Sequence, residues 1–209
     1  MKKIAILFGL SFLFVACNSS QKPEALQVEG SEYDFALAEN LFLFDALPSS
    51  AKNEENLRTE EKIALGHALY FDTRLSLTGN NSCNSCHNLA SFGVDNLPTS
   101  PGDNGGFGDR NSPTVLNAAL HSMQFWDGRM KDVEEQAGGP ILNPVEMAIP
   151  SQEFLMNRLK DIELYQKMFA AAYPNEEDLF TYKNVQYAIA SFERELLTPS
   201  RFDEYLKGN

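Results

Sequence analysis

Apolar residues recur at helical spacing in several stretches of this chain, and no stretch shows the alternation typical of a strand. The clearest pattern covers residues 182–197. Its apolar positions follow one another at spacings of four, three and four residues: Val185, Ile189, Phe192 and Leu196. Such a stripe occupies one face of a helix and predicts that this face is buried. The chain is therefore expected to be mainly α-helical.

Capping residues mark the ends of other helices. One helix is predicted over residues 59–72, because Thr59 is a good N-cap and two glutamates follow it in the first turn. Another is predicted to begin at Ser151 and to continue until Pro174 ends it. Both helices carry apolar residues at helical spacing, so each should pack one face against the rest of the domain.

The middle of the chain predicts shorter elements. Pro113 is favoured at the first position of a helix and predicts one over residues 113–120. Residues 125–129 predict a turn. A short helix is expected over residues 132–137, ended by the Gly-Gly-Pro sequence at 138–140.

Residues 73–113 are rich in Gly, Asn, Asp, Ser and Pro and predict a long loop, which in a compact domain indicates function or a bound group. This loop contains Cys83-Asn84-Ser85-Cys86-His87. The pattern C-x-x-C-H is the attachment sequence of c-type haem. Two thiols three positions apart each add to a vinyl group of one porphyrin, and the histidine that follows supplies a nitrogen ligand to the iron. We expect the motif to open a short helix.

Other uses of two cysteines fit this segment less well. A thioredoxin-like dithiol would follow a strand, whereas the motif follows the polar residues 78–82. A structural zinc site would need two more Cys or His ligands, and no second pair lies nearby. One covalent haem c is therefore the expected cofactor.

The N-terminus predicts an export signal. Lys2 and Lys3 precede an apolar stretch that is too short to span a bilayer and that ends at Cys17. This resembles a lipoprotein signal over residues 1–16, with a lipid on Cys17 and a polar tether over 17–34, although a plain secretory peptide remains an alternative. Residues 35–209 would then form the haem domain on the periplasmic side of a bacterial membrane, attached by its lipid anchor only.

The charge limits the choice of partners. The formal net charge is −12, and loss of the two lysines of the signal would make it more negative. An acidic surface argues against nucleic acid and against electrostatic docking on anionic lipid. It would suit a basic electron donor, and it would equally well keep the protein soluble.

Residues 59–207 resemble the N-terminal, peroxidatic half of bacterial di-haem cytochrome c peroxidases of the MauG-related superfamily. The match rests on short blocks in a fixed order. They are Phe71-Asp72-Thr73-Arg74-Leu75-Ser76, Cys83 to His87, Arg110-Asn111-Ser112-Pro113-Thr114, Phe125-Trp126-Asp127-Gly128-Arg129, Glu135-Gln136-Ala137, Asn143-Pro144-Val145-Glu146-Met147 and Ala190-Ser191-Phe192-Glu193-Arg194. The resemblance implies a cytochrome c-like helical domain with long loops around the haem, and reduction of hydrogen peroxide to water with electrons from a small cytochrome c or cupredoxin.

The resemblance also implies roles for individual residues. His87 is similar to the ligand of the peroxide-reacting haem, and Glu146 and Gln136 are similar to the family's distal-pocket pair. A carboxylate beside bound peroxide can take a proton from one oxygen and return it to the other, while a neutral amide can hold peroxide without changing charge. Trp126 matches a tryptophan thought to help electron transfer between the two haems.

Two further residues match a segment near the haem and a calcium ion. Arg110 is expected to contact the cofactor, and Asn111 resembles one ligand of Ca²⁺, for which an oxygen donor is suitable. One residue does not make a calcium site. His67 lies where relatives often have a basic residue and could contact a haem propionate, although an ordinary surface position is the alternative for it and is the expectation for His121.

The chain departs from the family in two ways. Asp103 occupies the position at which many members have a histidine that must be released from the iron on activation, so we expect this haem to be open opposite His87. The sequence also contains no second C-x-x-C-H. The chain could be truncated, could receive its second haem from another chain, or could work alone.

Other functions remain open at this point. A mono-haem electron carrier would need a sixth ligand, and the candidates are Met123, Met130, Met147 and Met156. A MauG-like oxidase would act on a protein substrate. An incomplete half of a di-haem peroxidase would have little activity alone.

Overall fold

The computed structural model describes residues 41–208. The chain divides into two compact units, residues 1–44 and 45–209. In the first unit the described part is a 3-10 turn, η1 (Leu41–Leu43). The predicted signal, the lipid site at Cys17 and the tether all lie outside the described residues. Within the described residues, no helix combines the length and the apolar character needed to cross a membrane.

The second unit is helical and contains no strand over residues 45–208. Two isolated bridges, between Pro101 and Phe107 and between Gln124 and Met130, are its only β-type pairs there. Its elements in chain order are α2 (Glu60–Phe71), η2 (Thr73–Leu75), α3 (Cys83–Cys86), η3 (Leu89–Ser91), η4 (Ala118–Leu120), α4 (Val133–Leu142), α5 (Gln152–Lys160), α6 (Glu163–Ala172), α7 (Tyr182–Glu193) and α8 (Arg201–Leu206). The mainly α-helical fold expected from the sequence is confirmed.

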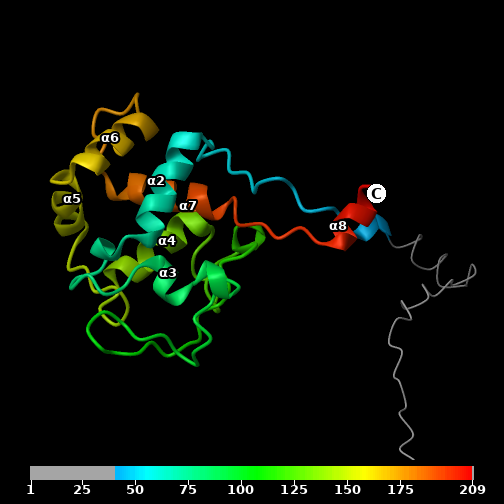
Figure 1. Ribbon diagram of the computed structural model, residues 1–209, viewed down its shortest axis with the longest axis horizontal. Coiled ribbons are helices and arrows are strands. Elements are labelled where there is room, and N and C mark those ends of the chain that lie inside the picture. Colours follow the sequence, from blue (N-terminus) through cyan, green and yellow to red (C-terminus); the bar gives the residue numbers. More distant parts are fainter. Residues whose placement is uncertain (1–40, 209) are drawn as a thin grey trace, which may run out of the picture. The chain divides into compact units, whose positions relative to one another are not determined.

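Helices α2 and α7 form the centre of this unit, with α4 beside α7 and with α5 and α6 along one side (Figure 1). The two central helices meet at Gly66, where an added Cβ would lie 1.9 Å from the Ala188 carbonyl oxygen. A glycine is therefore required for the two backbones to approach this closely. The core contains large side chains from all five helices, among them Leu65, Leu69, Tyr70, Ile141, Leu155, Leu159, Tyr165, Phe169, Val185 and Ile189.

The predicted caps are confirmed. Thr59 precedes α2 and its side chain accepts a hydrogen bond from the Lys62 amide, and Ser151 does the same for Phe154 at the start of α5. These signals are local, since a capping hydroxyl and the amide that it accepts from are three residues apart. Sequence alone is therefore sufficient to find them.

The predicted helix over residues 113–120 is wrong, because only η4 is helical there. The Val115 amide donates to the Gly93 carbonyl oxygen at 3.3 Å, and the Asn117 amide donates to the Leu196 carbonyl oxygen at 2.8 Å. In a helix beginning at Pro113, the Asn117 amide would donate to the Pro113 carbonyl oxygen, whereas the Val115 amide, in the first turn, would have no partner within the helix. Here they connect the segment to the loop after α3 and to the end of α7.

The predicted end of the helix at 138–140 is also wrong, because α4 continues through both glycines and Pro140 to Leu142. Gly138 packs so closely on α7 that an added Cβ would lie 2.5 Å from Gln186 Nε2. The Tyr182 hydroxyl donates to the Gly138 carbonyl oxygen at 2.6 Å. Tertiary packing thus overrides the low helix propensity of this sequence.

The C-terminal half differs in detail from the expected helices. The helix expected from Ser151 to Pro174 is two helices, α5 and α6, separated at Asp161 and Ile162, where Ile162 is extended. The last predicted helix ends at Glu193, four residues early. Helix α8 follows it with Ser200 as its cap, and the sequence pattern does not predict this helix.

Candidate functional site

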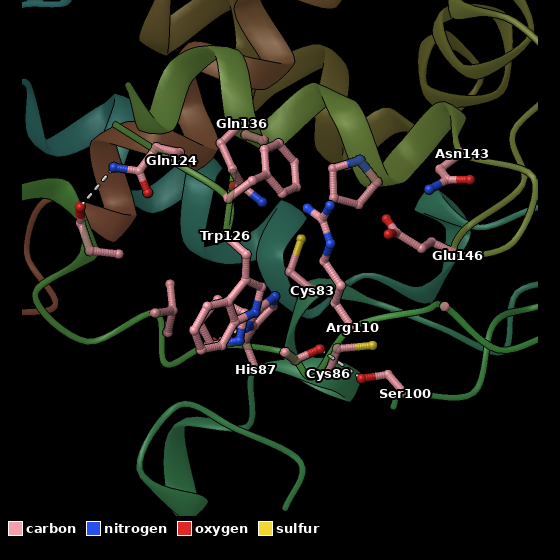
Figure 2. Close-up of a pocket in the computed structure, with 18 of the residues that line it drawn as sticks. Cys83, Cys86, His87, Ser100, Arg110, Gln124, Trp126, Gln136, Asn143 and Glu146 are labelled. Carbon is pink, nitrogen blue, oxygen red and sulfur yellow. Dashed lines mark hydrogen bonds between the residues drawn. The ribbon is translucent and has the colours of Figure 1, made fainter. Parts of the chain in front are cut away.

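A cavity of about 620 Å³ lies between α3 with its neighbouring loops on one side and α4 with the loop after it on the other (Figure 2). Its volume is within the usual range for cofactor and ligand sites. Its lining includes every residue that the sequence singled out for the site: Cys83, Cys86, His87, Arg110, Asn111, Trp126, Gln136 and Glu146. These residues come from a stretch of 64 positions of the chain and meet around one space.

The haem motif begins α3, as expected from the sequence. Ser82 precedes this short helix, and its amide donates to Ser85 Oγ at 3.0 Å, which fixes the entry to the motif. Neither Cys83 nor Cys86 is in a disulfide, and both thiols line the cavity. Burial raises the pKa of both thiols and favours their protonated form.

His87 is held by contacts on both its ring and its backbone. Its Nδ1 lies 2.9 Å from the Pro113 carbonyl oxygen, and since this oxygen can only accept, Nδ1 carries the proton. The Tyr70 hydroxyl donates to the His87 carbonyl oxygen at 2.6 Å. Burial lowers the pKa of the imidazole and favours its neutral form. The remaining nitrogen, Nε2, is therefore the one available as a metal ligand, with its orientation fixed from behind.

These features fit a covalently attached haem. Two thiols and one neutral imidazole with a fixed tautomer line the same cavity, and the cavity is of suitable size. Cys83 and Cys86 would form the thioether bonds and His87 would ligate the iron.

Gln136 and Glu146 approach the cavity from the α4 side. Gln136 projects from α4, and Glu146 projects from the loop after this helix, with both side chains directed toward the space above the haem motif (Figure 2). Burial raises the pKa of Glu146, and the positive charge of Arg129 partly opposes this shift. A half-buried carboxyl of raised pKa beside a neutral amide is suited to accept and return a proton.

The Glu146 backbone is tied to the loop that carries the haem motif. Its carbonyl oxygen accepts from the Asp103 amide at 2.7 Å, and next to it the Met147 carbonyl oxygen accepts from the Leu77 amide at 2.9 Å. Gly102 allows this approach, since an added Cβ would lie 2.1 Å from the Val145 carbonyl oxygen. Glu146 is therefore positioned by the same loop that presents the two cysteines.

Trp126, Arg110 and Asn111 lie together at the cavity mouth. Trp126 is 65% exposed, and its Nε1 donates to the Asn111 carbonyl oxygen at 2.8 Å. Arg110 forms an ion pair of 2.8 Å with Asp127, which also pairs with Arg129 at 2.9 Å. The two guanidinium groups hold the pKa of Asp127 at about 2.

The calcium prediction receives no further support from this geometry. The Asn111 side-chain amide donates to the Leu97 carbonyl oxygen at 2.6 Å. No group of three or more His, Cys, Asp or Glu side chains within residues 41–208 could hold a metal ion. The role of Asn111 as a Ca²⁺ ligand stays a prediction.

Asp103 does not line the cavity. Its side chain is buried, and its carboxylate accepts hydrogen bonds from the Thr78 amide at 2.6 Å and the Asn80 amide at 3.0 Å. Although burial opposes the shift, these donors lower the pKa of Asp103 below its ordinary value of 3.8. The residue connects the two ends of the loop around the haem motif.

This contact predicts a measurable loss of stability. We expect Asp103→Asn to lower the free energy of unfolding by about 1–2 kcal/mol at pH 7, since one of two charge-assisted hydrogen bonds is lost. The pKa of Asp103 is lower in the folded state, so its contribution is complete above the unfolded pKa near 3.9 and disappears as the pH falls through the folded pKa. Urea unfolding of both proteins at pH 7 and pH 3 checks this, and a deficit that is equal at the two pH values would contradict it.

The candidate methionines and histidines differ in whether they line the cavity. Met123 and Met147 line the cavity, whereas Met130 and Met156 do not. His121 lines the cavity and is exposed. His67 does not, and it packs between Phe71 and Phe192, with each pair of ring centroids 5.0 Å apart.

The lining also includes residues to which the sequence assigns no role, among them Arg129, Gln124 and Glu193. Arg129 falls in the predicted turn without a role of its own, although its guanidinium lies 3.5 Å from the centroid of the Phe125 ring. Gln124 is buried and its amide donates to the Ala118 carbonyl oxygen at 2.9 Å. Glu193 is buried at the end of α7. Glu193 follows Ile189 by four residues and so lies beside the apolar stripe of α7, which is the sequence feature that could have indicated its position in the cavity wall.

The sequence is similar to known haem proteins, in agreement with a cavity that fits a covalently attached haem. Residues 60–209 match the protein family described as di-haem cytochrome c peroxidase. The chain is 46% identical over 152 residues to the cytochrome c551 peroxidase of Pseudomonas aeruginosa, covering 72% of this chain and 44% of that protein. It is 44% identical over 163 residues to the cytochrome c551 peroxidase of Nitrosomonas europaea, covering 78% of this chain and 47% of that protein.

The fold has similar solved structures. The crystal structure of a MauG-like protein associated with microbial copper homeostasis superimposes with a TM-score of 0.71 at 30% sequence identity, covering 78% of this chain and 48% of that one. The chain spans about half the length of the curated relatives and the solved structure that it matches. With the family match extending over residues 60–209, the chain belongs to the di-haem cytochrome c peroxidase family.

Proposed function

We propose that this protein is a haem c peroxidase that reduces hydrogen peroxide to water with electrons from a small cytochrome c or cupredoxin. One observation carries the proposal: Glu146 and Gln136 line the same cavity as Cys83, Cys86 and His87. A c-type electron carrier has no need of an acid/base carboxyl beside its cofactor. A peroxidase does, because cleavage of the O–O bond requires a proton to move between the two oxygens.

Each side chain then has a defined task. Cys83 and Cys86 would hold the porphyrin, and His87 would supply the iron ligand. Haem c bound there would supply the iron that binds peroxide and the electrons that cleave it. Glu146 would accept a proton from one oxygen of the peroxide and return it to the other. Gln136 hydrogen-bonds the peroxide and orients it toward Glu146.

We also propose that peroxide enters without the release of a histidine ligand. The carboxylate of Asp103 is occupied by two backbone amides and lies outside the cavity lining, which supports an open position opposite His87. An electron paramagnetic resonance spectrum of the ferric protein tests this point. A spectrum of bis-histidine, low-spin iron alone would contradict it.

The partners and the location belong to the same proposal. Since the chain spans about half the length of these relatives, a second haem domain, on the same or on another chain, would relay electrons from the donor to this site. Trp126, which is exposed and lines the cavity, would assist that transfer. Export to the periplasmic side of the membrane, a lipid on Cys17 and a Ca²⁺ ion near Asn111 complete the proposal.

The test is peroxide-dependent oxidation of a reduced donor by the haem-loaded protein, with a reduced c-type cytochrome and a reduced cupredoxin assayed in parallel. Peroxide should be consumed in a 1:2 ratio to a one-electron donor. An absence of oxidation in the presence of an intact c-type haem spectrum, with and without an added second haem domain, would overturn the peroxidase assignment.

A second candidate is electron transfer alone, which the position of Met147 favours. Met147 is 5% exposed and lines the cavity, so its sulfur is a candidate for the sixth ligand of a carrier. A ferric spectrum of His/Met type that is insensitive to peroxide would support this candidate and reject the first.

A further inference from the structure

Glu193 is an anomaly on the inner face of α7. It is the last residue of the helix and follows Ile189 by one turn, and both side chains line the cavity. Glu193 is only 6% exposed. Over residues 41–208 its carboxyl group makes no hydrogen bond and no ion pair. Buried glutamates are nearly always paired, so an orphan carboxyl at this position needs an explanation.

The charged and titratable groups around Glu193 do not provide a partner. Glu134 of α4 lies near it and carries a negative charge, which disfavours ionisation of Glu193. Arg194, the next residue, is already bound to Glu134 through two hydrogen bonds. Tyr70 of α2 and Cys83 of α3 face Glu193, and burial raises the pKa of each far above the physiological range. Glu193 is therefore the one group of this cluster able to change its charge near neutral pH.

We infer that Glu193 is a proton-uptake site coupled to reduction of the haem iron. This inference rests on haem attachment at Cys83, Cys86 and His87, which is part of the proposed function, but it does not require that the protein turns over peroxide. On reduction, a one-electron protein donor would transfer one electron to ferric iron, and solvent would transfer one proton to the Glu193 carboxylate. The products would be ferrous iron and a neutral carboxylic acid.

The coupling follows from charge and position. A carboxylate that lines the haem cavity stabilises the more positive ferric state, and the low dielectric of a buried site strengthens the interaction. Reduction removes one positive charge and thereby raises the affinity of Glu193 for a proton. Without the cofactor, burial raises the pKa of Glu193 to about 8, so the exchange occurs near physiological pH.

The consequence for the reaction is local charge balance. Peroxide reduction consumes two protons and two electrons, and each electron that arrives without a proton leaves net negative charge in the buried site. With Glu193, an electron and a proton enter the cavity together. This function is distinct from that of Glu146, which moves a proton between the two oxygens of the substrate.

The test is a redox titration of the haem-loaded protein over pH 5 to 9.5. We expect the midpoint potential to be constant at low pH and then to fall with rising pH, by up to about 59 mV for each tenfold change in proton concentration. Glu193→Gln, locked in the neutral form, should remain at the low-pH potential of the wild type throughout. At high pH its potential should therefore exceed that of the wild type.

Two more variants make the result decisive. Glu195→Gln removes the same charge two residues away at a side chain that pairs with Arg58 and does not line the cavity, and it should retain the wild-type slope. Glu193→Asp keeps a carboxyl group and should keep a slope. A pH-independent potential in the wild type, or an equal slope in Glu193→Gln, would overturn the inference.

A second readout does not depend on any variant's stability. Infrared difference spectra between the oxidised and reduced wild-type protein should contain the C=O stretch of a carboxylic acid that forms on reduction and shifts in D₂O. Its absence would contradict proton uptake by a carboxyl group. A protein without a covalent haem spectrum would contradict haem attachment, and with it the proposed function, whereas a flat titration with intact haem contradicts only the role of Glu193.

Discussion

Glu146→Gln should lower the rate of peroxide reduction by about 10²–10⁴-fold, the usual contribution of a positioned general acid/base group. The amide has nearly the same size as the carboxyl group but can neither accept nor return a proton. Haem attachment should be unaffected, since Cys83, Cys86 and His87 are unchanged. The measurement is stopped-flow mixing of the ferric protein with peroxide, with the absorption spectrum as a check on haem content.

The control for this variant is Glu135→Gln. Glu135 lies on α4 beside Gln136, but its side chain is exposed and does not line the cavity. The rate of Glu135→Gln should therefore stay within about twofold of the wild-type rate, as is usual for a surface substitution. The pH profile adds a second check. Because burial raises the pKa of Glu146, the wild-type rate should rise with pH through a value above the ordinary 4.5, and Glu146→Gln should lack this step. A rate for Glu146→Gln close to that of the wild type would remove Glu146 from the mechanism.

Arg194→Met should lower the free energy of unfolding by about 3–5 kcal/mol, because it leaves a buried carboxylate without its counter-charge. Arg194 and Glu134 are both almost fully buried, and Arg194 Nε donates to Glu134 Oε1 at 2.9 Å. Burial alone would raise the pKa of Glu134, but the hydrogen bonds from Arg194 and Asn56 hold it below its ordinary value. Urea unfolding of the haem-loaded proteins measures the loss.

Two further variants separate charge from packing. The double variant Arg194→Met with Glu134→Leu removes both charges and should recover most of the lost stability. Lys167→Met breaks the exposed pair with Glu163 and should change the stability little. A double variant no more stable than Arg194→Met would show that the uncompensated charge is not the cause.

The parts of the fold that can be predicted from sequence are those with local signals. Thr59 and Ser151 are recognisable as caps because the amide that each accepts from is three residues away. The haem motif and the turn after Gln124 are recognisable for the same reason. The continuation of α4 through Pro140 is not, since it depends on close packing of Gly138 against α7, which no local pattern records.

Some residues of the candidate site can likewise be identified from the sequence, and others cannot. The resemblance identifies Glu146, Gln136 and Trp126 by their blocks of sequence, and all three line the cavity. Gln124 cannot be identified in this way, and Glu193 is indicated only by its position beside the apolar stripe of α7, which does not show that its carboxyl group is buried. Whether a carboxyl group is paired or orphaned depends on residues from four helices, and only the folded arrangement brings these residues together.

The hydrogen bonds that hold Asp103 have a consequence for the time course of peroxide reduction. The resemblance described for the sequence implies that many related proteins have at this position a ligand that must leave the iron before the first turnover, which would require the loop to move. Here the loop is held at both ends, by the Asp103 carboxylate to Thr78 and Asn80 and by the Asp103 amide to the Glu146 carbonyl oxygen. A progress curve started from fully oxidised protein should therefore be linear from its first seconds, and incubating the protein with reductant beforehand should not make it faster.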